Sequence, residues 1–184
     1  GNAYTIGIAS INVTAAALKT VNDATTVNVN AIVVAAITGS AADLAAVYGG
    51  GFTGLGNENV TVTDADVTAA DLKTINNAIS VNVNATAVTN ITGSAADLAN
   101  VYGGGFTGLG NETITVSDAN ISVSEANTID GYTTGAVTAT ISDTDIADLD
   151  GLNAAGNAYT ITVDTADVTA AALKIVNNAT TLDV

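Results

Sequence analysis

The sequence predicts an α/β fold in the form of a repeat solenoid, with about seven rungs that each contain a strand, a turn and a short helix. Three observations support this prediction. Residues 37–58 recur at 91–112, at an offset of 54 residues, with a single substitution. A second repeat has an offset of 155 residues, because GNAYT at 1–5 returns at 156–160. Short segments of alternating apolar and polar residues precede the helix-like segments, as in half-buried strands.

We expect the rungs to form a single array that covers residues 1–184 and is open at both ends. One rung cannot bury its apolar face alone, so neighbouring rungs must cover one another and form a parallel sheet on one face, in a layout similar to that of leucine-rich repeats. Val60 and Val62 are expected to lie over Val81 and Val83. The alternative is an all-β parallel β-helix in which the AADL segments are turns. The rungs are predicted near residues 4–26, 27–59, 60–80, 81–113, 114–136, 137–158 and 159–181.

The helix-like segments carry signals for their starts and ends. The TAAD segment at 68–71 indicates a helix N-terminus, because its hydroxyl can accept a free backbone N–H and its carboxylate favours the positive end of the helix dipole. Leu72 and Ile75 share the helix face that we expect to pack onto the strands. The asparagines at 76–77 and the glycines at 103–105 are predicted to end their helices.

The composition excludes several classes of function. The formal net charge is −15, with only 3 Lys and Arg residues and no His or Cys. The chain therefore lacks a thiolate nucleophile and a Ser–His pair, and it has no basic patch for nucleic acid. No apolar run approaches the ~20 residues that span a bilayer, so we expect no membrane insertion. The G-x-G-x-x-G match at 49–54 follows a predicted helix instead of opening one, so we expect no nucleotide site there. A pair of carboxylates could in principle hydrolyse a glycosidic bond, but a stack of rungs with two phenylalanines offers little of the concave, aromatic-lined pocket that this needs. We therefore expect no small-molecule substrate and no enzymatic activity.

The acidic residues concentrate at the predicted turns between strands and helices, most densely in SDTDIADLDG at 142–151. Ca²⁺ binds several oxygen ligands, and stacked carboxylates repel one another unless they are solvated or bridged by a cation. The segment lacks the spacing and the bidentate Glu of an EF-hand, so solvated helix caps are the simpler interpretation. Calcium is the one candidate cofactor, and its candidate ligands are Asp143, Asp145, Asp148 and Asp150.

The outward face of the predicted sheet carries rows of threonine and asparagine. Threonine favours strands, and such rows can hydrogen-bond from rung to rung, which is the simplest interpretation. The face could instead pack against a second copy of the chain, or bind ice as a flat array of threonines. The residues of this predicted interaction surface are Thr61, Thr63, Asn82, Asn84, Thr115, Thr138, Thr140, Thr160 and Thr162.

The most distinctive segments are ADVTAADLKTINNA at 65–78, ITGSAADLANVY at 91–102 and TGLGNE at 107–112. They resemble the repeat arrays of very large secreted surface proteins of aquatic bacteria, cyanobacteria especially, and the resemblance covers almost the whole chain. It implies an extracellular or cell-surface role, often beside calcium-binding modules in adhesin-like proteins, and it implies no catalytic residue. The loop at 49–57 departs from the RTX calcium nonapeptide, which has Asp where this chain has Gly54.

These observations lead us to expect a non-enzymatic structural or adhesive segment of an extracellular surface or matrix protein. Solenoids need polar terminal rungs, and neither end of the predicted array has one. Either the chain is part of a longer array, or its ends meet neighbouring copies. The expected partners are copies of the chain, joined laterally or end to end into filaments. The alternative function is a calcium-dependent adhesin module, or an ice-binding solenoid that uses the threonine and asparagine face.

Overall fold

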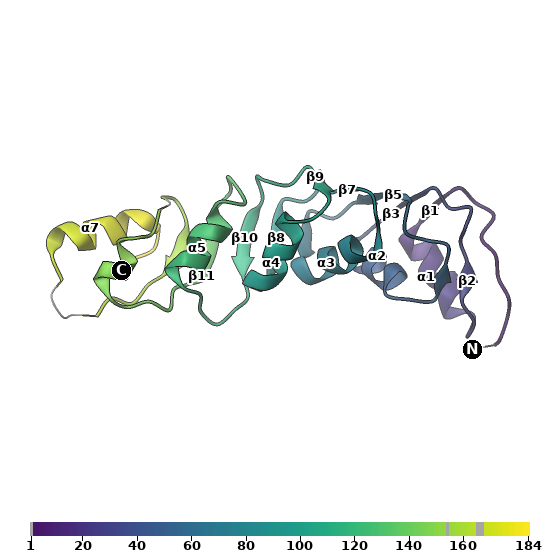
Figure 1. The fold of residues 1–184 in the computed structure, drawn as a ribbon, viewed down its shortest axis with the longest axis horizontal. Coiled ribbons are helices and arrows are strands. Elements are labelled where there is room, and N and C mark those ends of the chain that lie inside the picture. Colours follow the sequence, from purple (N-terminus) through teal and green to yellow (C-terminus); the bar gives the residue numbers. More distant parts are fainter. Residues whose placement is uncertain (1, 154, 165–167) are drawn as a thin grey trace. The chain divides into compact units, whose positions relative to one another are not determined.

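The computed structural model describes residues 2–153, 155–164 and 168–184, and it has a mixed α/β fold in which parallel strands alternate with helices (Figure 1). The chain divides into two compact units. The first comprises Gly1–Val88 with Asn100–Leu109, and the second comprises Thr89–Ala99 with Gly110–Val184. The boundary passes through helix α4 (Ala95–Tyr102).

Each unit contains strands and helices that follow one another along the chain. The first unit contains β1 (Asn12–Thr14), α1 (Ala15–Asp23), β2 (Val29–Asn30), β3 (Ala36–Gly39), α2 (Ala41–Tyr48), β4 (Phe52–Thr53), β5 (Asn59–Val62), β6 (Asp66–Thr68), α3 (Ala69–Ala78), β7 (Val83–Asn84) and β9 (Phe106–Thr107). The second contains β8 (Asn90–Gly93), β10 (Thr113–Val116), α5 (Val123–Asp130), β11 (Val137–Thr140), α6 (Ile146–Leu149), β12 (Ala158–Thr160) and α7 (Ala170–Ala179).

The α/β class with parallel strands is confirmed, and the all-β alternative is wrong. The AADL segments, which that alternative treats as turns, lie in helices α2, α3 and α4. Their hydroxyl-bearing N-caps explain why they are helical. Thr68 accepts a hydrogen bond from the Asp71 N–H at 3.1 Å, and Ser94 accepts one from the Asp97 N–H at 3.1 Å.

The strands β1, β3 and β5 of the first unit pair in parallel. Val13 of β1 lies opposite Ile37 of β3, and Ile37 lies opposite Val60 of β5. Ile37 and Val60 are buried, and the threonines that alternate with them form the adjacent outward row. The alternation of apolar residues with threonine thus produces one buried and one outward row, as the sequence predicts.

The second unit has the same arrangement. Ile91 of β8 lies opposite Ile114 of β10, which lies opposite Val137 of β11, and all three side chains are buried. Strand β12 continues the sheet, with Tyr159 opposite Ala139. Apolar residues of successive paired strands therefore lie opposite one another.

The predicted stacking of the Val60 strand on the Val83 strand is confirmed, because β5 pairs in parallel with β7, but its register is wrong by two residues. Thr61 lies opposite Asn84, so Val60, and not Val62, is level with Val83. On its other side β5 pairs with β3, where Val60 lies opposite Ile37 and Val62 opposite Gly39. The strand that precedes α2 is the segment AITG, which resembles a turn in sequence. It forms a strand because its glycine permits a close approach between rungs: a Cβ on Gly39 would lie 2.7 Å from the Cβ of Ala15.

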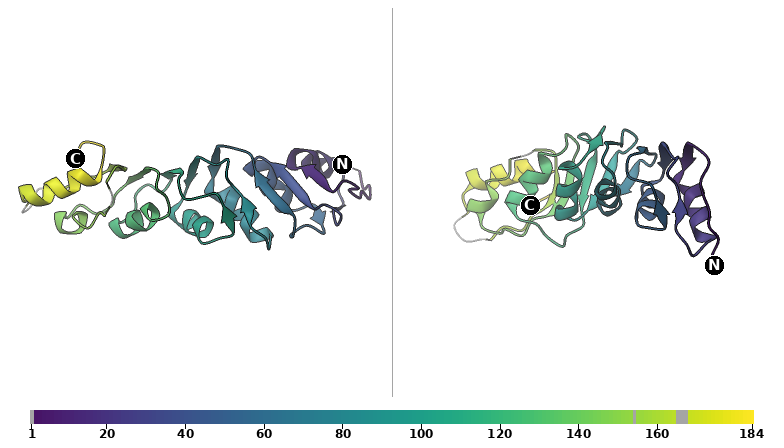
Figure 2. Two further views of the ribbon diagram at one scale, coloured as in Figure 1. Left: turned by 90° about the horizontal axis from the view of Figure 1, so that it is seen from above. Right: turned by 45° about the vertical axis from the view of Figure 1, so that its right-hand side comes forward.

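The apolar faces of the helices pack as predicted, but one predicted helix end is wrong. Leu72 and Ile75 of α3 are fully buried, and α1, α2 and α3 lie side by side in the first unit (Figure 2). Helix α4 ends at Tyr102, directly before the predicted glycines. Helix α3, however, continues through Asn76 and Asn77 to Ala78, because asparagine tolerates helical backbone where tertiary contacts hold it.

None of the helices in the described part of the chain combines the length and the apolar character that crossing a bilayer requires.

Candidate functional site

An aspartate that follows a strand caps the helix that precedes this strand in the chain. The N–H of Ala41, the first residue of α2, donates to Asp64 Oδ2 at 2.8 Å, across 23 residues of sequence. This bond satisfies one of the free donors at the helix N-terminus and places a negative charge at the positive end of its dipole. The same bond recurs twice in the second unit at 2.7 Å, from Ala95 to Asp118 and from Val123 to Asp143.

The four predicted metal ligands lie around helices α5 and α6. Asp143 caps α5, and Asp145 is the N-cap of α6, where it accepts the Ala147 N–H at 2.8 Å. Asp148 and Asp150 are exposed, at the third and the C-cap positions of α6. The structure brings Asp143 and Asp148 to one open hollow beside α5. Across the described residues, no group of three or more acidic side chains is close enough to hold a metal ion.

The predicted interaction surface is divided between the two units. In the first unit, Thr61 of β5 lies opposite Asn84 of β7, and both are half-buried. In the second unit, Thr115 lies opposite Thr138, and Thr140 opposite Thr160. These four threonines are exposed. The remaining predicted residues, Thr63, Asn82 and Thr162, are exposed but lie outside the strands.

Two asparagines of the strand face are engaged in hydrogen bonds. Asn84 Oδ1 accepts the Thr86 N–H at 3.1 Å and the Thr86 hydroxyl at 2.8 Å, which fixes the turn after β7. Asn90 Oδ1 accepts the hydroxyl of Thr113, its neighbour in the next rung. Only the second contact joins neighbouring strands, as the simplest interpretation of the polar rows expects.

A buried carboxylate in the loop after α2 was not predicted. Glu58 is only 2 % exposed, and its two oxygens accept the Gly56 N–H at 2.8 and 2.9 Å. The hydroxyl of Tyr48 donates to Glu58 Oε2 at 2.9 Å. Burial, reinforced by the charge of Glu58 and this bond, raises the pKa of Tyr48, so the phenol stays protonated and remains a donor. The available signal was the TGLGNE segment, which occurs unchanged in both copies of the repeat.

The second unit has a comparable buried polar group at the start of β12. Asn157 is 2 % exposed; its Oδ1 accepts the Val137 N–H at 2.7 Å and its Nδ2 donates to Asp130 Oδ1 at 2.8 Å. Asn157 Nδ2 also donates to the hydroxyl of Tyr159 at 3.1 Å. Burial and the charge of Asp130 raise the pKa of Tyr159. Glu58 thus ties the end of α2 to its own return loop, whereas Asn157 joins segments that lie 20 and 27 residues before it.

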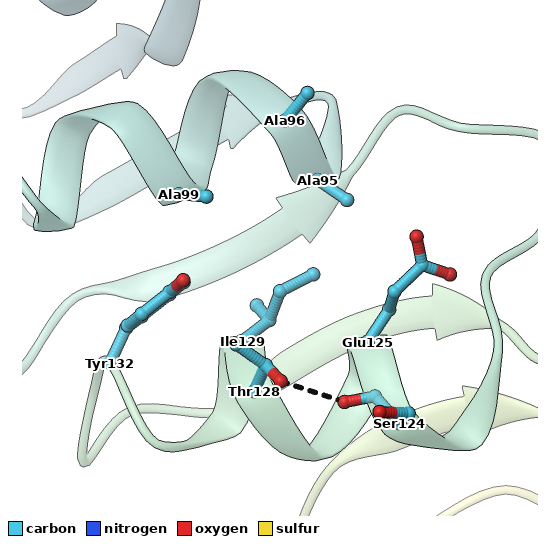
Figure 3. Close-up of a pocket in the computed structure, with 8 residues that line it drawn as sticks. All are labelled: Ala95, Ala96, Ala99, Ser124, Glu125, Thr128, Ile129 and Tyr132. Atoms are coloured by element: carbon cyan, nitrogen blue, oxygen red, sulfur yellow. Dashed lines mark hydrogen bonds between the residues drawn. The ribbon is translucent and has the colours of Figure 1, made fainter.

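A hollow of about 260 Å³ lies between the first half of α4 and the length of α5 in the second unit (Figure 3). The one carboxylate in its lining belongs to Glu125, which accepts the Ser122 N–H at 2.9 Å and the Ser122 hydroxyl at 2.8 Å in a capping box. These bonds lower the pKa of Glu125. The carboxylate is therefore committed to the cap of α5. The other lining residues are Ala95, Ala96, Ala99, Ser124, Thr128, Ile129 and Tyr132.

Comparison with protein-family models, with curated proteins and with solved structures returned no match for this chain.

Proposed function

We propose that this chain is a non-enzymatic structural or adhesive repeat segment, built as a solenoid of strand–turn–helix rungs. The observation that carries the proposal is the parallel pairing of equivalent residues in consecutive rungs. Ile37 lies opposite Val60 in the first unit, and in the second the rungs are linked by backbone bonds such as Ile114 N–H to Ala136 O at 2.9 Å. Such nearest-neighbour stacking is the basis of stability in repeat proteins.

The aspartate caps support the same proposal. Asp64, Asp118 and Asp143 each bind the helix of the rung before their own, so the order of the rungs is fixed by polar contacts as well as apolar ones. The formal charge of −15 keeps such a surface well hydrated and hinders nonspecific association. The location we propose is extracellular or at the cell surface, on the basis of the resemblance to secreted repeat arrays.

Association with copies of the same chain, laterally or end to end, completes the proposal. Exposed large apolar side chains occur mainly within residues 4–33 and 173–184, where they can be buried by a partner. In the first range they are Tyr4, Ile11, Val27, Ile32 and Val33, and in the second they are Leu173, Ile175, Leu182 and Val184.

Electron microscopy of the purified chain over a range of concentrations tests association. We expect particles that lengthen or thicken as the concentration rises, with a regular repeat along them. Particles of one size at every concentration would contradict association. A globular particle with no repeat would contradict the solenoid itself.

The exposed threonine pairs favour ice binding as a second candidate function. Thr115 and Thr138, and Thr140 and Thr160, occupy neighbouring strands, which are about 4.8 Å apart. Ice binding predicts thermal hysteresis that is lost when Thr138 and Thr140 are replaced by lysine. A concentrated solution without hysteresis would exclude it.

Calcium binding is the other alternative, because Asp143 and Asp148 share one hollow. A cation that binds only the folded chain raises its melting temperature. Melting with and without millimolar calcium tests this alternative, and an Asp148→Asn variant is the matched control because Asp148 has no part in the cap of α5.

A further inference from the structure

Helix α7 has almost the same sequence as helix α1 but different surroundings. AAALK at 15–19 returns as AAALK at 170–174. Leu18 is 1 % exposed, whereas the equivalent Leu173 is 39 % exposed. Ala15 is fully buried, whereas the equivalent Ala170 is exposed. The difference lies in what covers each helix, because the residues are the same.

The segment formed by residues 36–53 covers α1. Its strand β3 pairs with β1, and its helix α2 packs against α1. Two glycines permit this contact: a Cβ on Gly39 would lie 2.7 Å from the Cβ of Ala15, and a Cβ on Gly51 would lie 2.6 Å from Cγ of Asn22. Asn76 of α3 makes the equivalent contact one repeat later, where its Oδ1 accepts the Gly105 N–H at 2.9 Å. The segment that covers α1 thus has glycine at two contact positions, and the second of them recurs where Gly105 meets α3.

Helix α7 presents the same receiving residues, uncovered. Asn177, the equivalent of Asn22, is exposed. Leu173 lines an apolar hollow of about 340 Å³ together with Val163, Val168 and Asp164. The residues LDV at 182–184 correspond to VNV at 27–29, which lead into the covering segment of α1.

We infer that the exposed face of α7, formed by Ala170, Leu173 and Asn177, binds a further strand–helix rung of the kind formed by residues 36–53. The glycines equivalent to Gly39 and Gly51 are the specificity determinants, because any larger residue would overlap Ala170 or Asn177. This inference rests on the proposed function, since it treats α7 as one more member of a stack.

In the test, a second copy of residues 30–80 is added to the full chain after Val184. Because residues 182–184 correspond to 27–29, the added copy continues the repeat in the same order. Because the chain contains no cysteine, single Leu173→Cys and Leu18→Cys variants report burial through their rates of thiol alkylation. Leu173→Cys should react quickly in the original chain and about tenfold more slowly in the extended chain, since a buried thiol reacts only through local opening. Leu18→Cys should react slowly in both chains.

A matched control carries leucine in place of the glycine equivalent to Gly39 in the added segment, and it should restore fast alkylation at position 173. Hydrogen exchange of α7 amides in the cysteine-free extended chain is an independent readout, with protection expected only when that glycine is present. Unchanged alkylation of Leu173→Cys and unchanged exchange would overturn the inference. If Leu18→Cys is still protected, the stacking of rungs stands and only the α7 assignment fails.

The other occupant to test is a second copy of the chain. Protection of Leu173→Cys in the original chain that increases with concentration would show that a second copy covers α7. That result would contradict the inference that a further strand–helix rung covers α7. It would support association between copies of the chain.

Discussion

The hydroxyl of Tyr48 donates a hydrogen bond of 2.9 Å to the buried carboxylate of Glu58, ten residues further along the chain. The same carboxylate accepts the Gly56 N–H, so it is held by the end of α2 and by its own loop. A buried charge is tolerated only when its hydrogen-bonding capacity is satisfied. This pair therefore fixes the path of the loop that returns from α2 to β5.

Replacing Tyr48 with phenylalanine removes one of the donors to Glu58 and leaves the carboxylate buried. We expect the free energy of unfolding to fall by about 1–3 kcal/mol, the usual effect of losing a bond to a buried charged group. Urea unfolding measures the change. Tyr4→Phe is the control, because Tyr4 is 56 % exposed and its loss of a hydroxyl should have little effect. Equal effects at the two positions would show that the Tyr48 bond contributes nothing specific.

The raised pKa of Tyr48 predicts a loss of stability in alkali. In the unfolded chain the phenol ionises near its usual pKa of 10.0, whereas in the folded chain burial keeps it protonated to higher pH. A raised folded-state pKa gives stability that is complete below pH 10 and decreases as the pH rises further. The free energy of unfolding, measured between about pH 9 and pH 11, should therefore decline less steeply in Tyr48→Phe than in the parent chain. Parallel curves would contradict the assignment.

The caps between rungs predict that an aspartate stabilises a helix to which it does not belong. Asp118→Ala leaves the Ala95 N–H without its acceptor and should lower the free energy of unfolding by about 1–2 kcal/mol. Asp118→Asn, which keeps an acceptor oxygen but not the charge, should have a smaller effect. Denaturant unfolding measures both variants. The exposed Asp183 provides the control, and an Asp183→Ala effect as large as that of Asp118→Ala would mean that net charge alone is responsible.

The sequence predicted structural features that depend on residues close to one another in the chain. It missed features that depend on contacts with segments more than twenty residues away. The cap at Thr68 and the alternation around Val60 are local, and the structure confirms them. The strand at Ala36–Gly39 was missed because its glycine is explained only by Ala15, which precedes it by 24 residues. The acidic turns were placed correctly, but the partner of Asp64 is the Ala41 N–H of the preceding rung, which no local pattern indicates.

The burial of Glu58 was missed for a related reason. A glutamate in a glycine-rich loop is usually solvated, and only the fold brings the hydroxyl of Tyr48 to it. Among the predicted metal ligands, the sequence placed four aspartates within eight residues, but the first two cap helix N-termini and the last two are exposed on α6 and at its end. Asp143 and Asp145 cap two different helices, so proximity in sequence overstates their proximity as ligands.

Two backbone segments of the second unit approach each other closely at Gly135, which predicts that this glycine is sensitive to substitution. A Cβ on Gly135 would lie 2.6 Å from the carbonyl carbon of Glu112 and 3.0 Å from the Thr113 nitrogen. That carbonyl cannot move freely, because its oxygen accepts the Thr133 hydroxyl at 2.6 Å. Gly135→Ala must therefore shift backbone between β10 and β11, and we expect a loss of about 2–3 kcal/mol, measured by thermal or urea unfolding.

Gly7→Ala is the matched control for this substitution, because nothing lies within 4 Å of the position of its Cβ. Alanine there reduces the entropy of the unfolded chain without a steric conflict, so stability should be unchanged or should rise by up to about 1 kcal/mol. The two substitutions add the same methyl group, and they differ only in whether a neighbouring rung occupies the space. The same small effect at both positions would contradict the close contact between the Gly135 and Glu112 segments. It would also contradict tight packing between these two strands.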